Sequence, residues 1–351
     1  MISACRFDCG QCQELGVYCD GCPGCGVVLR KVSCDCSTCG YICPRRPGTK
    51  AFMKVGLAGS SFKEGRSIVP AGIDGLPIYL PAAGDRFKKT PDAGALPWVV
   101  VNGARFFSST GSGLRPSALA VVGDIKRWLN TLPETRVGIH FYVQDRFLEG
   151  LWKNRACSYK YLKQFDIVFS PNFSVYEDSP RYEHLINIRR CIRLYEEMLE
   201  FGIKAIPDVA WYQRKDLDWW ADYITKNSIQ VVAASTQTVG TGLHTLGSWK
   251  GYLAGIRYLA ERIPGDVRII IVGVSSPKKA RVVLREIGSG GRDISFMNSQ
   301  AFMKARKGKT FRADGRKEFV EGIDFDAFFL LNVSEFTKCY MDIKGEVTED
   351  A

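Results

Sequence analysis

Eight short apolar runs recur along this chain from residue 78 onward, and after the second nearly every run is followed by a helical pattern. The runs are continuous rather than alternating, which is typical of strands buried on both faces of a parallel sheet. Eight such units predict an α/β fold: a (β/α)8-like, TIM-type barrel that is distorted at its first unit, with an open doubly wound sheet as the alternative. The expected strands are residues 78–81, 98–101, 136–143, 166–169, 204–209, 229–234, 267–273 and 294–297.

Helical patterns occupy most of the intervals between these strands. They predict helices at residues 117–130, 145–162, 180–201, 217–226, 248–262, 278–286 and 299–307. The third of these mixes arginines with glutamates, so we expect it to present a solvated, ion-paired face. Residues 324–331 fit either an edge strand or a helix packed on the barrel.

The N-terminal segment differs from the rest, because it contains ten of the thirteen cysteines and no histidine. So short a segment cannot form an apolar core, and metal–thiolate bonds are the expected source of its stability. The C-x2-C-x2-C and C-x2-C-x3-C-P spacings resemble the ligand run of 4Fe-4S iron–sulfur proteins, which we favour; two Cys-x2-Cys-Gly pairs resemble zinc knuckles, so zinc is the alternative. The predicted ligands are Cys5, Cys9, Cys12, Cys19, Cys22, Cys25, Cys34, Cys36, Cys39 and Cys43.

Two other interpretations of the cysteines agree less well with the sequence. Disulfides need an oxidising compartment, whereas no secretory signal precedes Cys5, so we expect a cytoplasmic protein. The C-x3-C-x2-C spacing of residues 5–12 also occurs in radical S-adenosylmethionine enzymes, but there it follows the first strand of a barrel, and only four residues precede Cys5. Cys157, Cys191 and Cys339 stand alone and are expected to be structural.

Composition and charge divide the chain into four parts. We expect a cysteine-rich metal module at residues 1–44, a basic Gly/Ser-rich linker at 45–76, the barrel at 77–317 and an extension at 318–351. The formal net charge is +11, and basic residues cluster at 45–66 and 304–317. Such runs suit a nucleic-acid partner or, equally, a solvated surface. No apolar run is long enough to span a membrane, so no membrane partner is expected.

Polar residues follow the expected strands, at the end where the chemistry of parallel α/β folds takes place. Asp145 and Asp208 are the expected catalytic residues, as an acid/base pair or a nucleophile. For Asp145, capping of the next helix is the alternative. His140 lies within a strand and is expected to line the barrel rather than to bind a metal. The expected substrate-binding residues are Asn102, Arg146, Ser170, Asn172, Ser174, Tyr176, Arg181, Trp211, Ser235 and Thr236.

Four sequence blocks begin at His140, Ser170, Ile206 and Ala234, and the most specific reads Ser-Pro-Asn-Phe-Ser-Val-Tyr. In this order they resemble the domain-of-unknown-function family numbered 4417, over about residues 98–275. That family brings no established reaction. The order Ile-Pro-x-Val-x-Trp, then Ala-Ser-x-x-x-Val-Gly, is also similar in architecture to tRNA-guanine transglycosylase barrels. The chain departs from these at Asn102, where their Asp-Ser-Gly-Gly block would fall, and in its N-terminal cysteines.

Together these features predict a cytoplasmic metalloprotein that is an enzyme acting on nucleic acid or a nucleotide, by modifying a base or a nucleotide. One alternative is a non-catalytic nucleic-acid-binding protein of a phage or mobile element, with a structural metal site. Another is an iron–sulfur redox protein.

Overall fold

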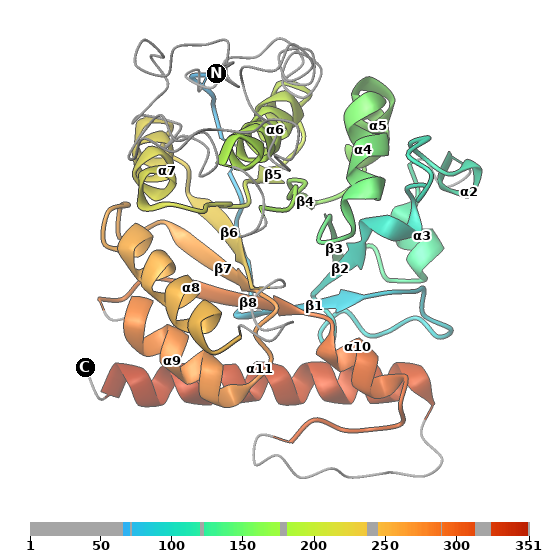
Figure 1. Ribbon diagram of the computed structural model, residues 1–351. Helices are drawn as coiled ribbons and strands as arrows, with labels where there is room; N and C mark the ends of the chain where they lie inside the picture. The colour runs from blue at the N-terminus through green and yellow to red at the C-terminus, as the bar shows by residue number, and fades with distance from the viewer. Residues whose placement is uncertain are drawn as a thin grey trace, which may run out of the picture.

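Eight parallel strands form one sheet that curls into a barrel surrounded by helices (Figure 1). The computed structural model describes residues 66–70, 72–119, 123–175, 181–236, 245–288, 290–312 and 324–349, with only the backbone of 181–183 and 245–248. The cysteine-rich module and most of the expected linker lie outside these residues. The strands are β1 (Tyr79–Ala83), β2 (Trp98–Asn102), β3 (Arg136–His140), β4 (Ile167–Phe169), β5 (Ala205–Ile206), β6 (Val231–Ser235), β7 (Arg268–Val272) and β8 (Ile294–Asn298).

The barrel closes between its fifth and sixth strands. The sheet order is β5-β4-β3-β2-β1-β8-β7-β6, so β1 and β8 are already paired. Just beyond β5, Asp208 pairs with Ala233 of β6. The Val209 N–H donates to the Ala233 carbonyl at 2.8 Å, and the Ala233 N–H donates to the Pro207 carbonyl at 2.9 Å. The prediction of a (β/α)8-like barrel is therefore confirmed.

Helices cover the outside of the barrel, but among the described residues none joins β1 to β2. The expected distortion of the first unit therefore takes this form. The helices are η2 (Gly103–Arg105), α2 (Pro116–Leu119), α3 (Ile125–Leu129), α4 (Asp145–Lys153), α5 (Arg155–Leu162), α6 (Arg181–Glu200), α7 (Arg214–Lys226), α8 (Thr245–Ala260), α9 (Pro277–Ile287), α10 (Gln300–Ala305) and α11 (Phe325–Glu349).

The long helix α11 takes the place of the missing first helix and runs beside α9 and α10 (Figure 1). The ring of Tyr340 stacks on Phe296 of β8 at 4.4 Å between centroids. The ring of Phe336 lies 5.3 Å from that of Tyr79 in β1. Residues 324–331, for which the sequence left two choices, therefore begin a helix packed on the barrel.

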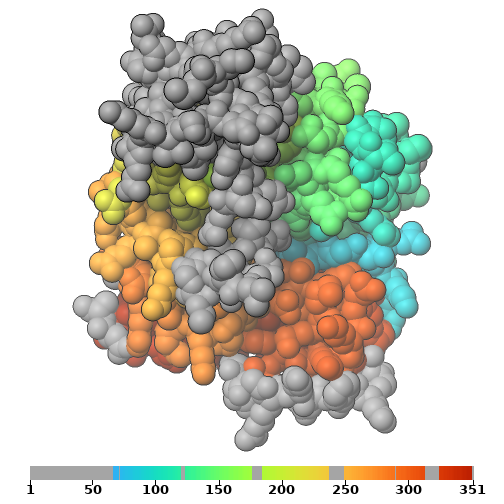
Figure 2. Space-filling view, in the orientation of Figure 1, coloured from blue at the N-terminus to red at the C-terminus, as the bar shows by residue number. Residues whose placement is uncertain are grey.

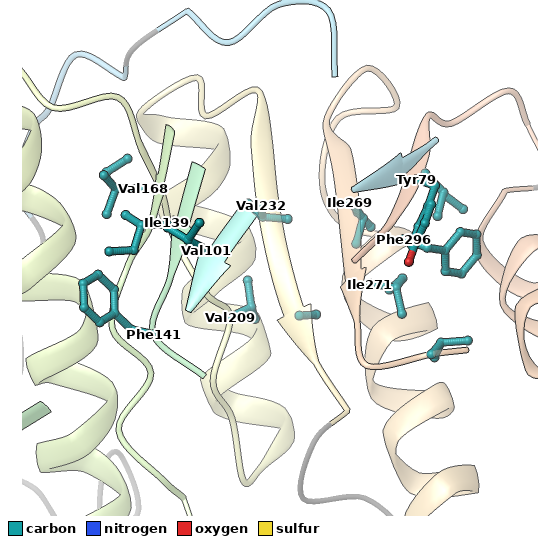
Figure 3. Packing of buried hydrophobic residues seen from close by; sticks show 14 of the residues in the cluster. Tyr79, Val101, Ile139, Phe141, Val168, Val209, Val232, Ile269, Ile271 and Phe296 are labelled. Atoms are coloured by element: carbon teal, nitrogen blue, oxygen red, sulfur yellow. The ribbon is translucent and has the colours of Figure 1, made fainter. Parts of the chain in front are cut away.

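Alternation of side chains along the strands separates two apolar clusters. One set points outward to the helices; it includes Val101, Ile139 and Val168, as Figure 3 shows. The other set fills the barrel interior, where Gly138 has no room for a side chain, since a Cβ there would lie 2.8 Å from Cγ1 of Ile167. The interior residues are Leu76, Leu80, Trp98, Val100, Tyr142, Ile167, Phe169, Ile206, Val231, Ala233, Ile270, Val272 and Met297.

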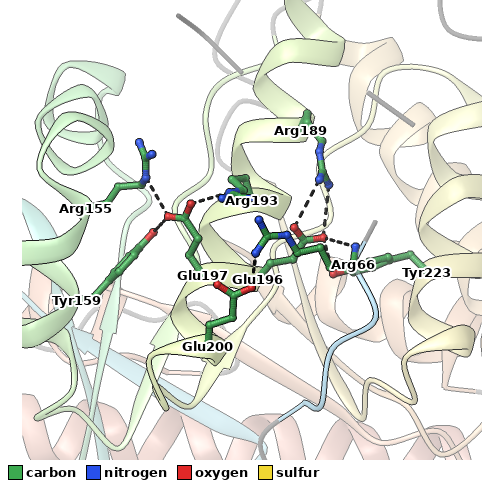
Figure 4. Close-up of polar contacts among 9 residues, drawn as sticks. All are labelled: Arg66, Arg155, Tyr159, Arg189, Arg193, Glu196, Glu197, Glu200 and Tyr223. Atoms are coloured by element: carbon green, nitrogen blue, oxygen red, sulfur yellow. Dashed lines mark hydrogen bonds and ion pairs between the residues drawn. The ribbon is translucent and has the colours of Figure 1, made fainter. Parts of the chain in front are cut away.

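Helix α6 carries a buried network of ion pairs rather than the solvated face that the sequence predicted (Figure 4). Glu197 accepts hydrogen bonds from Arg155, Arg193 and the Tyr159 hydroxyl at 2.6–2.9 Å. Glu196 is fully buried and pairs with Arg189 at 3.5 Å. That prediction was wrong about solvent because α5 and α7 pack over this face, which the pattern within one helix does not reveal.

Two expected helices are interrupted. Residues 117–130 form α2 and α3 instead of one helix, and Asp124 caps α3 by accepting from the Arg127 N–H at 3.2 Å. Residues 145–162 are divided into α4 and α5 at Asn154, whose backbone leaves the helical conformation. In the described part of the chain, no helix is long and apolar enough to cross a membrane.

Candidate functional site

A cavity of about 600 Å³ opens at the carboxyl ends of the strands. Its volume falls in the range of small-molecule sites, roughly 300–1,000 Å³. The ends of β1, β2, β7 and β8 and the segments after β1, β7 and β8 supply most of its wall, including Gly84, Asn102, Ser275 and Ser299. The carboxyl ends of parallel strands are where active sites of such barrels lie.

A tyrosine in the wall of this cavity is paired with a buried aspartate. By strand alternation, Tyr142 follows His140 on the interior face, and both line the cavity. The Tyr142 hydroxyl donates a 2.7 Å hydrogen bond to Oδ1 of Asp208, which is 1% exposed. The other carboxyl oxygen, Oδ2, is buried and has no hydrogen-bond partner among the described residues. The aspartate backbone N–H donates to Ser170 Oγ at 3.1 Å, which fixes the carboxyl group at the β5–β6 junction.

Burial changes the proton affinity of this pair. It raises the pKa of Asp208 to about 7, although the hydrogen bond from Tyr142 acts in the opposite direction. Burial also raises the pKa of Tyr142 well above its usual value, and the charge of Asp208 adds to this. Near neutral pH the carboxyl group therefore exchanges its proton while the phenol stays protonated, which are the properties of a general acid or base.

His140 is neutral at this position because burial lowers its pKa to about 4. Its Nδ1 accepts a hydrogen bond from the Tyr142 backbone N–H at 3.3 Å. A neutral imidazole that accepts at Nδ1 carries its proton on Nε2. His140 therefore offers the cavity a hydrogen-bond donor without a charge.

The rim of the cavity is basic and aromatic. Lys279 and Arg306 line it, and Lys279 Nζ lies 4.6 Å from the centre of the Trp249 ring. Ser275 and Ser276 lie beside them, just before α9. None of the cavity-lining residues in the described part of the chain is acidic. This arrangement favours an anionic ligand that also has a planar ring.

Asp145, the second expected catalytic residue, belongs to a neighbouring cluster. It accepts hydrogen bonds from the Ser174 hydroxyl at 2.9 Å and from the Ser174 backbone N–H at 3.3 Å. Among the described contacts its carboxyl group has no hydrogen-bond partner within α4; instead it joins the start of α4, just after β3, to the loop after β4. Burial raises its pKa. Among the described contacts, no hydrogen bond joins it to Asp208. Burial is the main cause of the raised pKa of the nearby Cys191 thiol, and the charges of both carboxyl groups add to it.

The other expected substrate-binding residues have different positions. Asn102 and Thr236 line the cavity, Ser170 lies beneath it, and Arg146 is exposed, with its guanidinium 5.5 Å from the Phe147 ring. Trp211 packs so closely on α8 that a Cβ at Gly255 would lie 2.8 Å from its Nε1. Asn172, in the loop after β4, and Ser235, the last residue of β6, are half-buried. Tyr176 and the Arg181 side chain lie outside the described residues, so their roles stay predictions.

Several cavity residues were not among the predicted site residues. The alternation from His140 would have identified Tyr142, and Arg306 belongs to the basic run at 304–317. Lys279 lies in the first turn of α9, beyond the residues directly after β7 from which the site was predicted. Trp249 gave no local signal, because a helical tryptophan is usually a core residue.

Metal ligands are a separate question, because all ten predicted cysteine ligands lie outside the described residues. Within the described ranges, no group of three or more His, Cys, Asp or Glu side chains could hold a metal ion. Cys191 and Cys339 are buried there, whereas Cys157 is exposed. The metal module and its iron–sulfur or zinc content therefore remain predictions.

Comparison with known families confirms the family expected from the four sequence blocks, for one segment of the chain. Residues 117–281 match the model of the family described as Domain of unknown function (DUF4417). The segment extends from α2 into α9 and contains His140, Tyr142 and Asp208. It does not include the cysteines at the N-terminus, and the similarity to transglycosylase barrels finds no support. A search of curated proteins finds no match to the chain.

Proposed function

We propose that this protein is an enzyme that acts on a nucleotide unit, free or within a nucleic acid, at the mouth of its barrel. The observation that carries the proposal is the composition of one cavity. Tyr142, hydrogen-bonded to the buried Asp208, shares it with the cations Lys279 and Arg306 and with the ring of Trp249. A nucleotide has the matching parts: a planar base, a group that exchanges protons and an anionic phosphate.

The proposed chemistry is proton transfer through Tyr142. When Asp208 is protonated, its proton can pass to the tyrosine oxygen while the tyrosine passes its own proton to a ligand atom in the cavity. One proton moves from the carboxyl group to the ligand, and the reverse path removes one. Tyr142 is then the catalytic residue, and Asp208 holds the proton behind it. This favours an acid/base role for Asp208 over a nucleophilic one, since the tyrosine lies between the carboxyl group and the cavity.

The rest of the cavity supports binding and orientation. Neutral His140 supplies a donor that pays no charge-burial cost, which suits the polar edge of a base. The half-buried Trp249 supplies an aromatic ring for stacking in the cavity wall. Lys279 and Arg306 suit the phosphate, whose negative charge no acidic lining residue in the described chain would oppose.

The N-terminal cysteines enter the proposal as a separate module. We retain the expectation that they bind metal through thiolates alone, as iron–sulfur clusters or as zinc. No step of the proton transfer at Tyr142 depends on them.

Calorimetric titration with nucleoside monophosphates and the corresponding nucleosides tests the binding part. Lys279→Gln should weaken monophosphate binding about tenfold, the usual effect of one charged contact, and leave nucleoside binding unchanged. Lys278→Gln is the matched control, because this neighbour is exposed and does not line the cavity. Equal loss in both variants, or failure of every nucleotide to bind, would refute the assignment.

Mass spectrometry of nucleotides and oligonucleotides incubated with the protein tests the catalytic part. Tyr142→Phe and Asp208→Asn should abolish any product while ligand binding persists. Tyr252→Phe is the control, because that buried hydroxyl donates to the Ala234 carbonyl at 3.2 Å instead of to Asp208. Product formed unchanged by Tyr142→Phe would exclude the proposed acid/base role, and binding without product across the panel would favour a non-catalytic protein.

A further inference from the structure

A second cavity, of about 290 Å³, shares no lining residue with the first and has no role in the proton transfer. Its lining residues come from η2, α2, α3 and the loop between β2 and α2: Arg105, Phe106, Arg115, Ser117 and Trp128. Two of the five are arginines, and none is acidic. The lining of this cavity therefore combines positive charge with the aromatic rings of Phe106 and Trp128.

The two arginines are held in position. Arg115 Nε donates to the Phe107 carbonyl at 2.9 Å, which directs the guanidinium group. Arg105 lies 5.9 Å from the centre of the half-buried Trp128 ring. It also pairs with Asp85 at 2.6 Å, so the charge of Arg105 is partly compensated and that of Arg115 is the stronger attraction for an anion.

Short stretches of chain and one ion pair connect the linings of the two cavities. Asn102 and Gly84 line the main cavity. Arg105 lies three residues after Asn102, which limits the distance between their Cα atoms to about 11 Å. Asp85 directly follows Gly84, and its ion pair with Arg105 joins the segments after β1 and β2. In Figure 2 the surface of α2 and α3 adjoins that of the residues after β1.

We propose that the second cavity binds a backbone phosphate of a single-stranded nucleic acid whose target nucleotide occupies the main cavity. The inference rests on the proposed function and narrows it, because the substrate becomes a strand rather than a free nucleotide. Arg105 and Arg115 contact the phosphate next to the target, and the face of Trp128 stacks on the flanking base. A base must leave the stack to enter a cavity, so a single strand is preferred over a duplex. The net charge of +11 fits a polyanionic substrate.

Fluorescence anisotropy with short single-stranded DNA and RNA oligonucleotides tests this, alongside calorimetry with monophosphates. The wild-type protein should bind at least one strand about tenfold or more tightly than the best monophosphate. The Arg105→Gln/Arg115→Gln double variant should lose that advantage and still bind the monophosphate. For single strands the log–log salt slope changes by roughly 0.7 per phosphate neutralised, so loss of this one phosphate site should reduce it by about 0.7.

Arg127→Gln is the matched control, because Arg127 is a neighbouring arginine of α3 whose side chain is 88% exposed and which does not line the cavity. Arg105→Gln alone keeps the test valid if the double variant unfolds, because this side chain is 46% exposed. A strand that binds no more tightly than a monophosphate, equal binding of a matched duplex, or an equal loss in Arg127→Gln would overturn the inference and leave the proposed function intact. Failure of the monophosphates to bind would instead remove the proposed function.

Discussion

The hydroxyl of Tyr142 donates a 2.7 Å hydrogen bond to the carboxyl group of Asp208 near the carboxyl ends of the strands. Tyr142 lies two residues after His140, on the same interior face of the barrel. Burial shifts the pKa values of Asp208 and His140 in opposite directions. The pKa of Asp208 rises to about 7 and that of His140 falls to about 4. Folding is linked to protonation wherever a pKa differs between the folded and unfolded states. The two residues should therefore give opposite dependences of stability on pH.

Asp208→Asn should become more stable relative to the wild type as the pH rises from 4 to 7. In the wild type, the unfolded carboxyl ionises near its ordinary pKa of 3.8, whereas the folded one resists ionisation up to about 7. The stability present at low pH is therefore lost across this interval, on the order of 4 kcal/mol at 1.36 kcal/mol per pKa unit. Urea unfolding of both proteins at several pH values measures the difference. A difference that does not change with pH would show that the folded Asp208 titrates normally.

His140→Asn should show the opposite trend. The unfolded imidazole gains a proton below its ordinary pKa of 6.5, whereas the folded one resists protonation down to about 4. The wild type therefore loses stability as the pH falls through this interval, by roughly 3 kcal/mol, and the variant is free of that loss. Relative to the wild type, the variant should become less stable as the pH rises from 4 to 6.5. Tyr252→Phe serves as the control for both residues, and its difference from the wild type should be independent of pH.

Asp145→Ala should lower the free energy of unfolding by about 1–3 kcal/mol, because it removes two part-buried hydrogen bonds that each contribute about 0.5–1.5 kcal/mol. The change removes both acceptors of Ser174, whose N–H and hydroxyl then lose their partner. Denaturant unfolding measures the cost, and Asp222→Ala, at an exposed position on α7, should cost less than about 0.5 kcal/mol. If Asp145→Ala lowers the free energy of unfolding no more than the control does, Asp145 does not stabilise the contact between the start of α4 and the loop after β4.

The strands were predictable because each is a continuous apolar run, and each of the eight expected runs overlaps an observed strand. Their ends were less predictable. Residues 204–209 were expected as one strand, yet β5 spans only Ala205–Ile206, because its pairing with β4 ends there and Asp208 pairs with Ala233 of β6 instead. The candidate site was predicted only in part, because its contacts depend on how the strands come together in the barrel. Position after a strand identifies Asn102 and Thr236, whereas the partnership of Tyr142 with Asp208 depends on closure of the barrel, which joins residues 66 positions apart.

Phe336→Ala in α11 should destabilise the protein by about 3–5 kcal/mol, the usual cost of truncating a buried phenylalanine. The ring is fully buried, stacks on Phe311 at 3.7 Å and lies against Tyr79 of β1. Met341→Ala is the control in the same helix, because Met341 is 56% exposed and should cost less than about 0.5 kcal/mol. Thermal or urea unfolding compares the two. Similar small losses would mean that α11 does not replace the missing helix between β1 and β2.

Metal bound by this chain should depend on the N-terminal cysteines alone. Anaerobically purified protein should contain enough metal for two four-thiolate centres, brown with a thiolate–iron absorption band if iron–sulfur, colourless if zinc. Replacement of Cys157, Cys191 and Cys339 by Ala should leave the metal content unchanged, because these thiols stand apart from one another and from any candidate ligand group in the described ranges. Replacement of Cys22 and Cys25 by Ser should lower it. Elemental analysis that finds less metal in the triple variant, or mass spectrometry that finds disulfides among the N-terminal cysteines, would contradict the assignment.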